Sequence, residues 1–177
     1  MNASATNIIL LCILLWIAVQ DVRTNRISNR MILIGLSGGL LFQVSTRGGE
    51  GVLYFLVLSI LPVIILYSLF RISALGAGDI KLFSMIGSFL TVKELCGWMI
   101  LSFGIGAGLA LLILIKNGLF QERIQFFFKY LREAVVEFPN IKKYGEVSPG
   151  KKYVMHFTVP MLLGFLLSAI LERGGLY

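Results

Sequence analysis

The chain has 177 residues, of which 57% are hydrophobic and only 14% are charged, and its mean hydropathy is +0.87. Soluble domains carry about a quarter of their residues as charged side chains, so this composition excludes an ordinary soluble protein and predicts an integral membrane protein. The net charge of +7 is explained by basic loop residues that set membrane topology and meet anionic lipid, and we expect no nucleic-acid partner. Nothing resembles a soluble module or a linker, which predicts one membrane domain over residues 1–177.

Six apolar segments are candidates for membrane-spanning helices, each of which needs about 20 mostly apolar residues. In chain order they cover residues 3–20, 27–44, 52–70, 80–92, 95–115 and 153–171. The fourth segment is the shortest and also fits a half-buried or re-entrant helix. The first segment has the length of a signal-peptide core, but no basic residue precedes it and no cleavage pattern follows it, so we expect a retained helix.

The basic residues favour all six spans, with the amino terminus outside. Thirteen Lys and Arg residues then lie in three cytoplasmic loops and three lie outside, as the positive-inside rule requires. Omitting the fourth span would move the eight basic residues of the third loop, 116–152, across the membrane. Within that loop, apolar residues recur every three or four positions over 120–138, which predicts an amphipathic helix. It lies either on the cytoplasmic membrane surface or over the inner mouth of the bundle.

Two aspartates lie at equivalent membrane boundaries. Asp21 follows the first span, and Asp79 precedes the fourth span in the sequence Gly-Ala-Gly-Asp at 76–79. The simplest explanation for Asp21 is an interfacial carboxylate paired with Arg23 or Arg26, and for Asp79 it is a helix N-cap. Carboxylates at membrane edges are scarce and costly, however. Two of them brought together share one proton, which is what an aspartic protease needs.

The glycines beside Asp79 support the second interpretation. An N-cap needs neither Gly76 nor Gly78, whereas glycine permits positive φ and lets another backbone approach closely. A protease must admit an extended substrate strand beside its acid, so glycines serve a purpose there. Lys81 is interpreted as a basic residue of the inner face and not as a catalytic group.

The two acidic segments together resemble the type IV prepilin peptidases, a family of membrane aspartic proteases. Asp21-x5-Ile27-Ser28-Asn29 resembles the first motif of that family, with Ser28 where the family has Pro. Gly76-Ala77-Gly78-Asp79-Ile80-Lys81 resembles its GxGD motif, and the two acids are 58 residues apart. The segment 156–160 weakly resembles the start of the family's final span. The paired CxxC motifs of the methyltransferase region found in larger members are absent from this sequence, which implies a peptidase-only form.

This resemblance implies an endopeptidase that cleaves the leader peptide from prepilin-like or preflagellin-like precursors at the cytoplasmic face of the cell membrane. Asp21 and Asp79 are the expected catalytic pair, with one water activated between them. No metal or other cofactor is expected, and the expected partners are the precursor and the lipid bilayer. The resemblance specifies neither the leader sequence nor the oligomeric state. The residues expected to bind the substrate or to shape its site are Gly76, Gly78, Asn29 and Lys81.

Two functions of other classes stay open. Membrane carboxylates serve as proton or cation relays in ion-coupled carriers, although such relays tend to lie near the midplane and not at one face. A non-catalytic membrane subunit of a secretion system would leave the Gly-x-Gly-Asp sequence unexplained.

Several other residues are assigned to packing. The glycines of 35–39 and of 104–108 predict close helix contacts within the molecule. Cys12 and Cys96 are predicted to be buried thiols, because they form no CxxC or Cys/His cluster. His156, the single histidine, is expected to be an interfacial or hydrogen-bonded residue and not a ligand.

Overall fold

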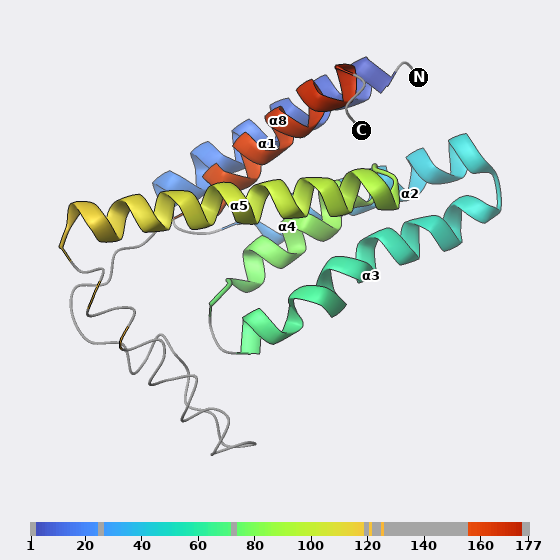
Figure 1. Ribbon diagram of the computed structural model, residues 1–177. Helices are drawn as coiled ribbons and strands as arrows, with labels where there is room; N and C mark the ends of the chain where they lie inside the picture. Colours follow the sequence, from blue (N-terminus) through green and yellow to red (C-terminus); the bar gives the residue numbers. More distant parts are fainter. Residues whose placement is uncertain are drawn as a thin grey trace.

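The structure is a computed structural model in which residues 3–24, 27–71, 74–118, 121, 125 and 156–174 are described. These residues form helices and no strand, which confirms the predicted all-helical fold for this part of the chain. Figure 1 shows an elongated bundle in which α1 and α8 lie side by side, with the first turns of α1 and the last turns of α8 at the same end. The helices are α1 (Ala3–Thr24), α2 (Asn29–Arg47), α3 (Glu50–Arg71), α4 (Ala77–Gly87), α5 (Val92–Lys116) and α8 (Thr158–Arg173).

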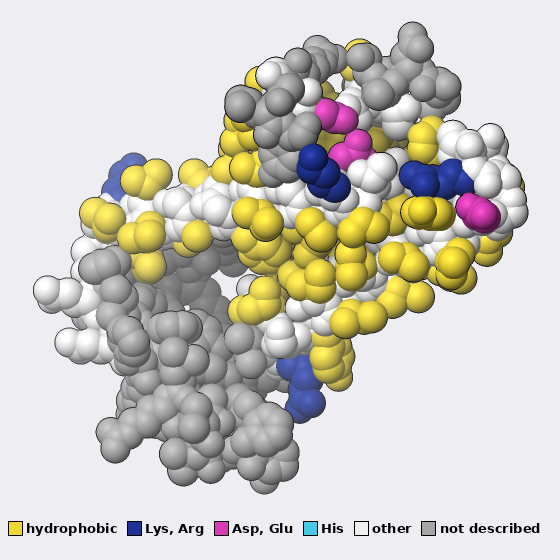
Figure 2. Space-filling model, turned by 45° about the vertical axis from the view of Figure 1, so that its right-hand side comes forward, with side chains coloured by type: hydrophobic (Ala, Val, Ile, Leu, Met, Phe, Trp, Pro, Cys, Tyr) yellow, Lys and Arg dark blue, Asp and Glu magenta, His cyan; other side chains and the backbone are white. Residues whose placement is uncertain are grey.

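Three helices are long and apolar enough to cross a membrane, namely Thr6–Thr24, Glu50–Arg71 and Val92–Lys116, and α8 is apolar but shorter. Their outward faces carry exposed apolar side chains, such as Leu53 and Ile64 of α3, which are 66% and 68% exposed. Figure 2 shows hydrophobic side chains spread over most of the coloured surface, with charged side chains gathered at a few places. Apolar surface of this extent belongs in lipid and not in water. The number of six spans and their orientation stay predictions.

The helix boundaries differ from the predicted spans around the fourth helix. α4 begins at Ala77 and ends at Gly87, whereas the prediction for this segment was 80–92. The cause is a capping box that starts α5 early: Thr91 N–H donates to the Glu94 carboxylate at 2.6 Å, and Glu94 N–H donates to Thr91 Oγ1 at 3.4 Å. α1 also continues through polar residues to Thr24, beyond the predicted end at residue 20.

α4 forms the buried centre of the bundle, where it packs against α2, α3 and α5. Residues 82–88 are buried without exception. On α2, Gly35 faces Met85 and Gly39 faces Ser88 so closely that an added Cβ would force a movement. The predicted packing role of the α2 glycines is therefore confirmed. With 11 residues, α4 is about 16 Å long, which is about half of a hydrocarbon core of about 30 Å.

α8 packs against α5 through one buried hydrogen bond and one close backbone contact. The Trp98 indole Nε1 donates to the main-chain oxygen of Met161 at 2.9 Å, and both residues are fully buried. Gly164 lies against Ser102, where an added Cβ would meet the Ser102 main-chain nitrogen at 2.8 Å. Small residues let these two helices approach closely.

The glycine-rich stretch of α5 contributes to the same interface through one of its members. An added Cβ at Gly106 would lie 2.8 Å from the Phe157 ring and 3.5 Å from Pro160, whereas Gly104 and Gly108 face open space. The predicted packing role is thus confirmed for Gly106.

Two further predictions have different outcomes. The predicted amphipathic helix of 120–138 lies outside the described residues, apart from residues 121 and 125, and stays a prediction. The prediction of two buried thiols is wrong, because Cys12 is exposed and Cys96 is half-buried, both as free thiols. Cys12 lies on the apolar outer face of α1, where a thiol behaves as a small hydrophobic group.

Candidate functional site

Asp21 lies in the last turn of α1, inside the helix and not after it as predicted. Its half-buried carboxylate accepts a hydrogen bond from Thr158 Oγ1, and the Thr158 Oγ1 to Asp21 Oδ2 distance is 2.9 Å. The simplest sequence interpretation paired Asp21 with Arg23 or Arg26. The structure gives it the hydroxyl group of Thr158 instead, while Arg23 is exposed and Arg26 lies outside the described residues.

Asp79 lies in the first turn of α4, and its carboxylate is also half-buried. The N-cap of α4 is Gly76, so the interpretation of Asp79 as the N-cap residue is wrong by three positions. Asp79 instead reaches back to the helix start, where its Oδ2 accepts the Gly76 N–H at 3.3 Å. An acid at this position satisfies a helix-end N–H group and lies near the positive end of the helix dipole.

The electrostatic environment of Asp79 connects it to Asp21. Asp79 lies outside the three long apolar helices, and burial, the largest cause, raises its pKa to about 6. The Gly76 hydrogen bond lowers this pKa, the negative charge of Asp21 raises it, and His156 lowers it. The charge of Asp21 thus reaches Asp79, so the two predicted acids lie near enough to interact electrostatically.

The two glycines before Asp79 provide room for side chains. Gly76 has φ −76° and ψ 148°, an extended conformation open to any residue, so the positive φ considered from the sequence is not used. An added Cβ at Gly76 would lie 3.0 Å from Asp79 Oδ2, and one at Gly78 would lie 3.2 Å from Ile27 Cδ1. The glycines therefore keep space around the acid and let the segment before α2 pack against α4.

Asn29 and Lys81, the other two predicted site residues, are also brought together. Lys81 Nζ donates to Asn29 Oδ1 at 3.0 Å, which joins the second turn of α4 to the first residue of α2. Both side chains are exposed, so they lie at the rim of the acid site and not inside it.

Two residues of this site were not identified from the sequence. Thr158 contacts Asp21, and half-buried His156 is close enough to Asp79 to lower its pKa. Both belong to the His-Phe-Thr-Val-Pro segment that opens the last apolar stretch. The available signal was the pair of polar side chains, His156 and Thr158, just before Pro160, because Pro is common in the first turn of a helix.

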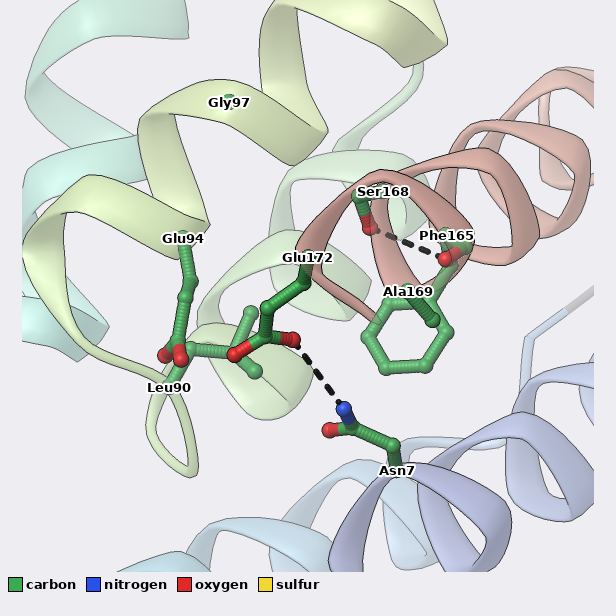
Figure 3. Close-up of a pocket in the computed structure, with 8 residues that line it drawn as sticks. All are labelled: Asn7, Leu90, Glu94, Gly97, Phe165, Ser168, Ala169 and Glu172. Atoms are coloured by element: carbon green, nitrogen blue, oxygen red, sulfur yellow. Dashed lines mark hydrogen bonds between the residues drawn. The ribbon is translucent and has the colours of Figure 1, made fainter. Parts of the chain in front are cut away.

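A second acidic cluster lies at the other end of the bundle. Figure 3 shows Glu94 of α5 and Glu172 of α8 with their carboxylates near each other, and Asn7 Nδ2 donates to Glu172 Oε2 at 3.3 Å. A cavity of about 380 Å³ adjoins this cluster. Asn7 precedes Asp21 by 14 residues of one helix, which corresponds to about 21 Å. The Glu94–Glu172 cluster is therefore separate from the Asp21–Asp79 site.

Comparison with known proteins identifies the family. The model of the type IV leader peptidase family matches residues 8–111. This range holds Asp21 and Asp79, together with Asn29, the glycines before Asp79, and Lys81. No curated protein and no solved structure gives a significant match. Since the family match covers more than half of the chain and includes both acids, the chain belongs to the type IV leader peptidase family.

Proposed function

We propose that this protein is a membrane aspartic endopeptidase that removes N-terminal leader peptides from prepilin-like or preflagellin-like precursors. The proposal is carried by the family match, whose range holds both Asp21 and Asp79, and it is supported by the effect of the Asp21 charge on Asp79. Two close carboxyl groups do not both ionise readily, so the pair holds one proton over a range of pH. One carboxylate and one carboxylic acid are the two groups needed to activate water against a peptide bond.

In the proposed reaction, the carboxylate takes a proton from water as the water oxygen bonds to the scissile carbonyl carbon. The carboxylic acid gives its proton to the carbonyl oxygen, which forms a tetrahedral diol. The C–N bond then breaks as the first acid returns the captured proton to the leaving nitrogen. The second carboxylate recovers its proton from a diol hydroxyl as the new carboxyl product forms.

The proposed orientation places both acids at the cytoplasmic face, in agreement with the distribution of basic residues. The apolar helix of a precursor would lie in the bilayer beside the bundle, with its leader junction at the acids. Gly76 and Gly78 leave room for the extended junction, and the Lys81–Asn29 hydrogen bond holds the rim of the site.

The test is cleavage of a co-expressed precursor in membranes, for the wild type and for Asp21→Asn and Asp79→Asn. Asparagine keeps the size of the side chain but neither holds nor transfers the proton. The matched control is Glu94→Gln, which changes an acid of the opposite cluster and keeps a residue able to complete the capping box.

We expect the wild type and Glu94→Gln to trim the leader, and both asparagine variants to accumulate uncut precursor at equal abundance in membranes. Efficient cleavage by either asparagine variant would assign that aspartate a structural role and overturn the mechanism. Failure of the wild type on a panel of prepilin-like and preflagellin-like precursors would overturn the proposed substrate class.

A further inference from the structure

The cavity of about 380 Å³ at the other end of the bundle from Asp21 and Asp79 has no part in the proposed reaction. Its walls come from the first turns of α1 and α5, the last turns of α2 and α8, and the link between α4 and α5. When α1 and α5 cross a membrane, as their length and apolar character allow, their ends lie among the lipid headgroups. The cavity is therefore at the level of the headgroups and not of the acyl chains.

The acidic side of the cavity has no cationic partner. Figure 3 shows the carboxylates of Glu94 and Glu172 near each other, with Asn7 bonded to Glu172. Within the part of the chain that the structure describes, neither carboxylate forms an ion pair with a Lys or Arg. Neighbouring carboxylates repel each other when both are ionised, and a cation beside them offsets that repulsion. This side of the cavity is therefore suited to a positively charged group.

Two buried side chains add oxygen atoms that lack a hydrogen-bond donor. Thr6 is 8% exposed and Gln43 is 2% exposed, and both line the cavity. The Gln43 amide nitrogen donates to the main-chain oxygens of Ser88 and Leu90 at 3.0 and 3.3 Å, which leaves Oε1 as its remaining polar atom. Among the described residues, neither Gln43 Oε1 nor the Thr6 hydroxyl group has a partner, and the fully enclosed side-chain atom without one is Ser59 Oγ. The Gln43 and Thr6 oxygens are therefore reached from the cavity, where a donor can meet them.

The α2 wall of the cavity provides a basic side chain, Arg47. Its guanidinium carbon lies 4.0 Å from the centre of the Tyr54 ring, so one face of the guanidinium group is covered. The N–H groups at its edge are left to bind an anion such as phosphate. Of the described residues that line the cavity, Arg47 is the one Lys or Arg. The lining thus combines acids on α5 and α8 with a base on α2.

The size and the charges of the cavity select among ligands. Its volume of about 380 Å³ corresponds to about a dozen waters at about 30 Å³ each. A metal ion fills a small part of that space, and the charge of Arg47 opposes it. An anionic headgroup without an amine offers nothing to the acids, and a quaternary ammonium has no N–H group to donate. A primary ammonium group joined by a short chain to a phosphate matches both the acids and the base.

We propose that this cavity binds the headgroup of phosphatidylethanolamine. The ammonium group donates to the Glu172 carboxylate, to Gln43 Oε1 and to the Thr6 hydroxyl group, and Arg47 donates to the phosphate. The cavity lies between two groups of helices, since α8 packs against α1 and α5, while α2 packs against α3 and α4. A bound headgroup joins these two groups and stabilises the bundle. This site is separate from the acids of the proposed peptidase.

The test uses the purified full chain in neutral detergent. Phosphatidylethanolamine, phosphatidylcholine or phosphatidylglycerol with the same acyl chains is added at equal mole fraction, and the unfolding temperature is followed by tryptophan fluorescence. The variants are Glu172→Gln and Arg47→Gln. Their matched controls are Glu50→Gln and Arg71→Gln, which remove the same charges from exposed residues outside the cavity lining. For each protein the ethanolamine and choline lipids are compared, so a general change in stability cancels.

At about ten times its dissociation constant, phosphatidylethanolamine should raise the unfolding temperature of the wild type by about 3–6 °C relative to either other lipid. Glu172→Gln and Arg47→Gln should lose at least about half of this difference, and the two controls should keep it. An equal rise with the choline lipid would overturn the proposal. A loss in the controls as large as in the variants, or a larger rise with Mg²⁺ or Ca²⁺ in place of lipid, would overturn it as well.

A second measurement uses the wild type alone and so does not depend on how the variants fold. The protein is mixed with equal amounts of phosphatidylethanolamine, its N,N-dimethyl derivative and phosphatidylcholine, and the retained lipid is identified by native mass spectrometry. We expect retention to fall as N–H groups are replaced by methyl groups, with about tenfold preference for ethanolamine over choline. Equal retention of the three lipids would overturn the proposal. Neither measurement involves cleavage, so a failure of the proposed peptidase function leaves this result unchanged.

Discussion

The indole nitrogen of Trp98 lies 2.9 Å from the main-chain oxygen of Met161, less than one turn after Thr158 in α8. Through this contact, α5 determines where the amino-terminal end of α8 lies relative to α1. The Asp21–Asp79 site therefore depends on an interface that holds neither acid. Changes in the packing of α5 against α8 should reach the site through Thr158.

Gly164→Ala tests this dependence. The added Cβ would meet the main-chain nitrogen of Ser102 at 2.8 Å, so the helices must separate. We expect a loss of about 1–3 kcal/mol in the free energy of unfolding, together with reduced cleavage. The measurement is thermal unfolding in detergent. The control is Gly104→Ala, which faces open space in α5 and should be neutral or slightly stabilising. Equal unfolding temperatures for Gly164→Ala and the wild type would show that this close contact is not required.

Gly76→Ala tests why the residue three positions before Asp79 is a glycine. The new methyl group would lie 3.0 Å from Asp79 Oδ2 and push the carboxyl group out of position. Small misplacements of a catalytic group cost up to about a hundredfold in rate, so we expect kcat to fall at least tenfold with little change in unfolding temperature. Gly49→Ala, at a turn with open space, is the control. Full activity of Gly76→Ala would contradict this role of the glycine.

The pH dependence of cleavage follows from the environment of Asp79. Burial raises the pKa of Asp79 to about 6, so its proton is held below that pH and lost above it. Because one member of the proposed pair must be protonated, we expect kcat to decline as pH rises from about 6 to 8. The measurement is the initial rate at saturating precursor in vesicles. A rate that is constant or rises over this interval would show that cleavage does not depend on the proton of Asp79.

Asp79→Asn should stabilise the protein while it removes activity. The raised pKa means that the folded state binds a proton more tightly than the unfolded state, so the stability that this proton provides is complete below about pH 4 and is lost as pH rises to about 6. The asparagine side chain of the variant does not ionise, so the variant does not lose this stability as pH rises. We expect Asp79→Asn to be more stable than the wild type by on the order of 1 kcal/mol at pH 7, after allowance for the partial exposure of the group. At pH 4 the difference should be close to zero.

Thermal unfolding at pH 4, 5, 6 and 7 measures this difference. The control is Glu50→Gln, which changes an exposed acid in the first turn of α3. Its difference in stability from the wild type should not grow between pH 4 and pH 7. A difference between Asp79→Asn and the wild type that is independent of pH would mean that ionisation of Asp79 is not its source.

The sequence predicted the helices and the two acids because both leave local signals. Apolar runs set the number and order of the described helices, and the Gly-Ala-Gly-Asp sequence singled out Asp79. The early start of α5 had a local signal as well, since Thr91 and Glu94 have the spacing of a capping box. That signal was missed because the apolar run continues across it.

Other features had no local signal. The partner of Asp21 is Thr158, which comes from the far end of the chain, and only the packing of α8 against α1 and α5 brings it there. The burial of Cys12 was predicted wrongly because the outside of a membrane bundle is as apolar as its inside. In such a protein, hydrophobicity shows that a residue avoids water but not which neighbours it has.

The shortness of α4 has a consequence for how the protein is made. A helix of 11 residues is too short to enter a bilayer on its own apolar character. It reaches its place only when α2 and α3, made before it, and α5, made after it, surround it. Asp79 is carried by this helix, and the partner of Asp21 is carried by α8, which the ribosome produces last of the six. The environment of Asp21 is therefore complete only after α8 has been synthesised.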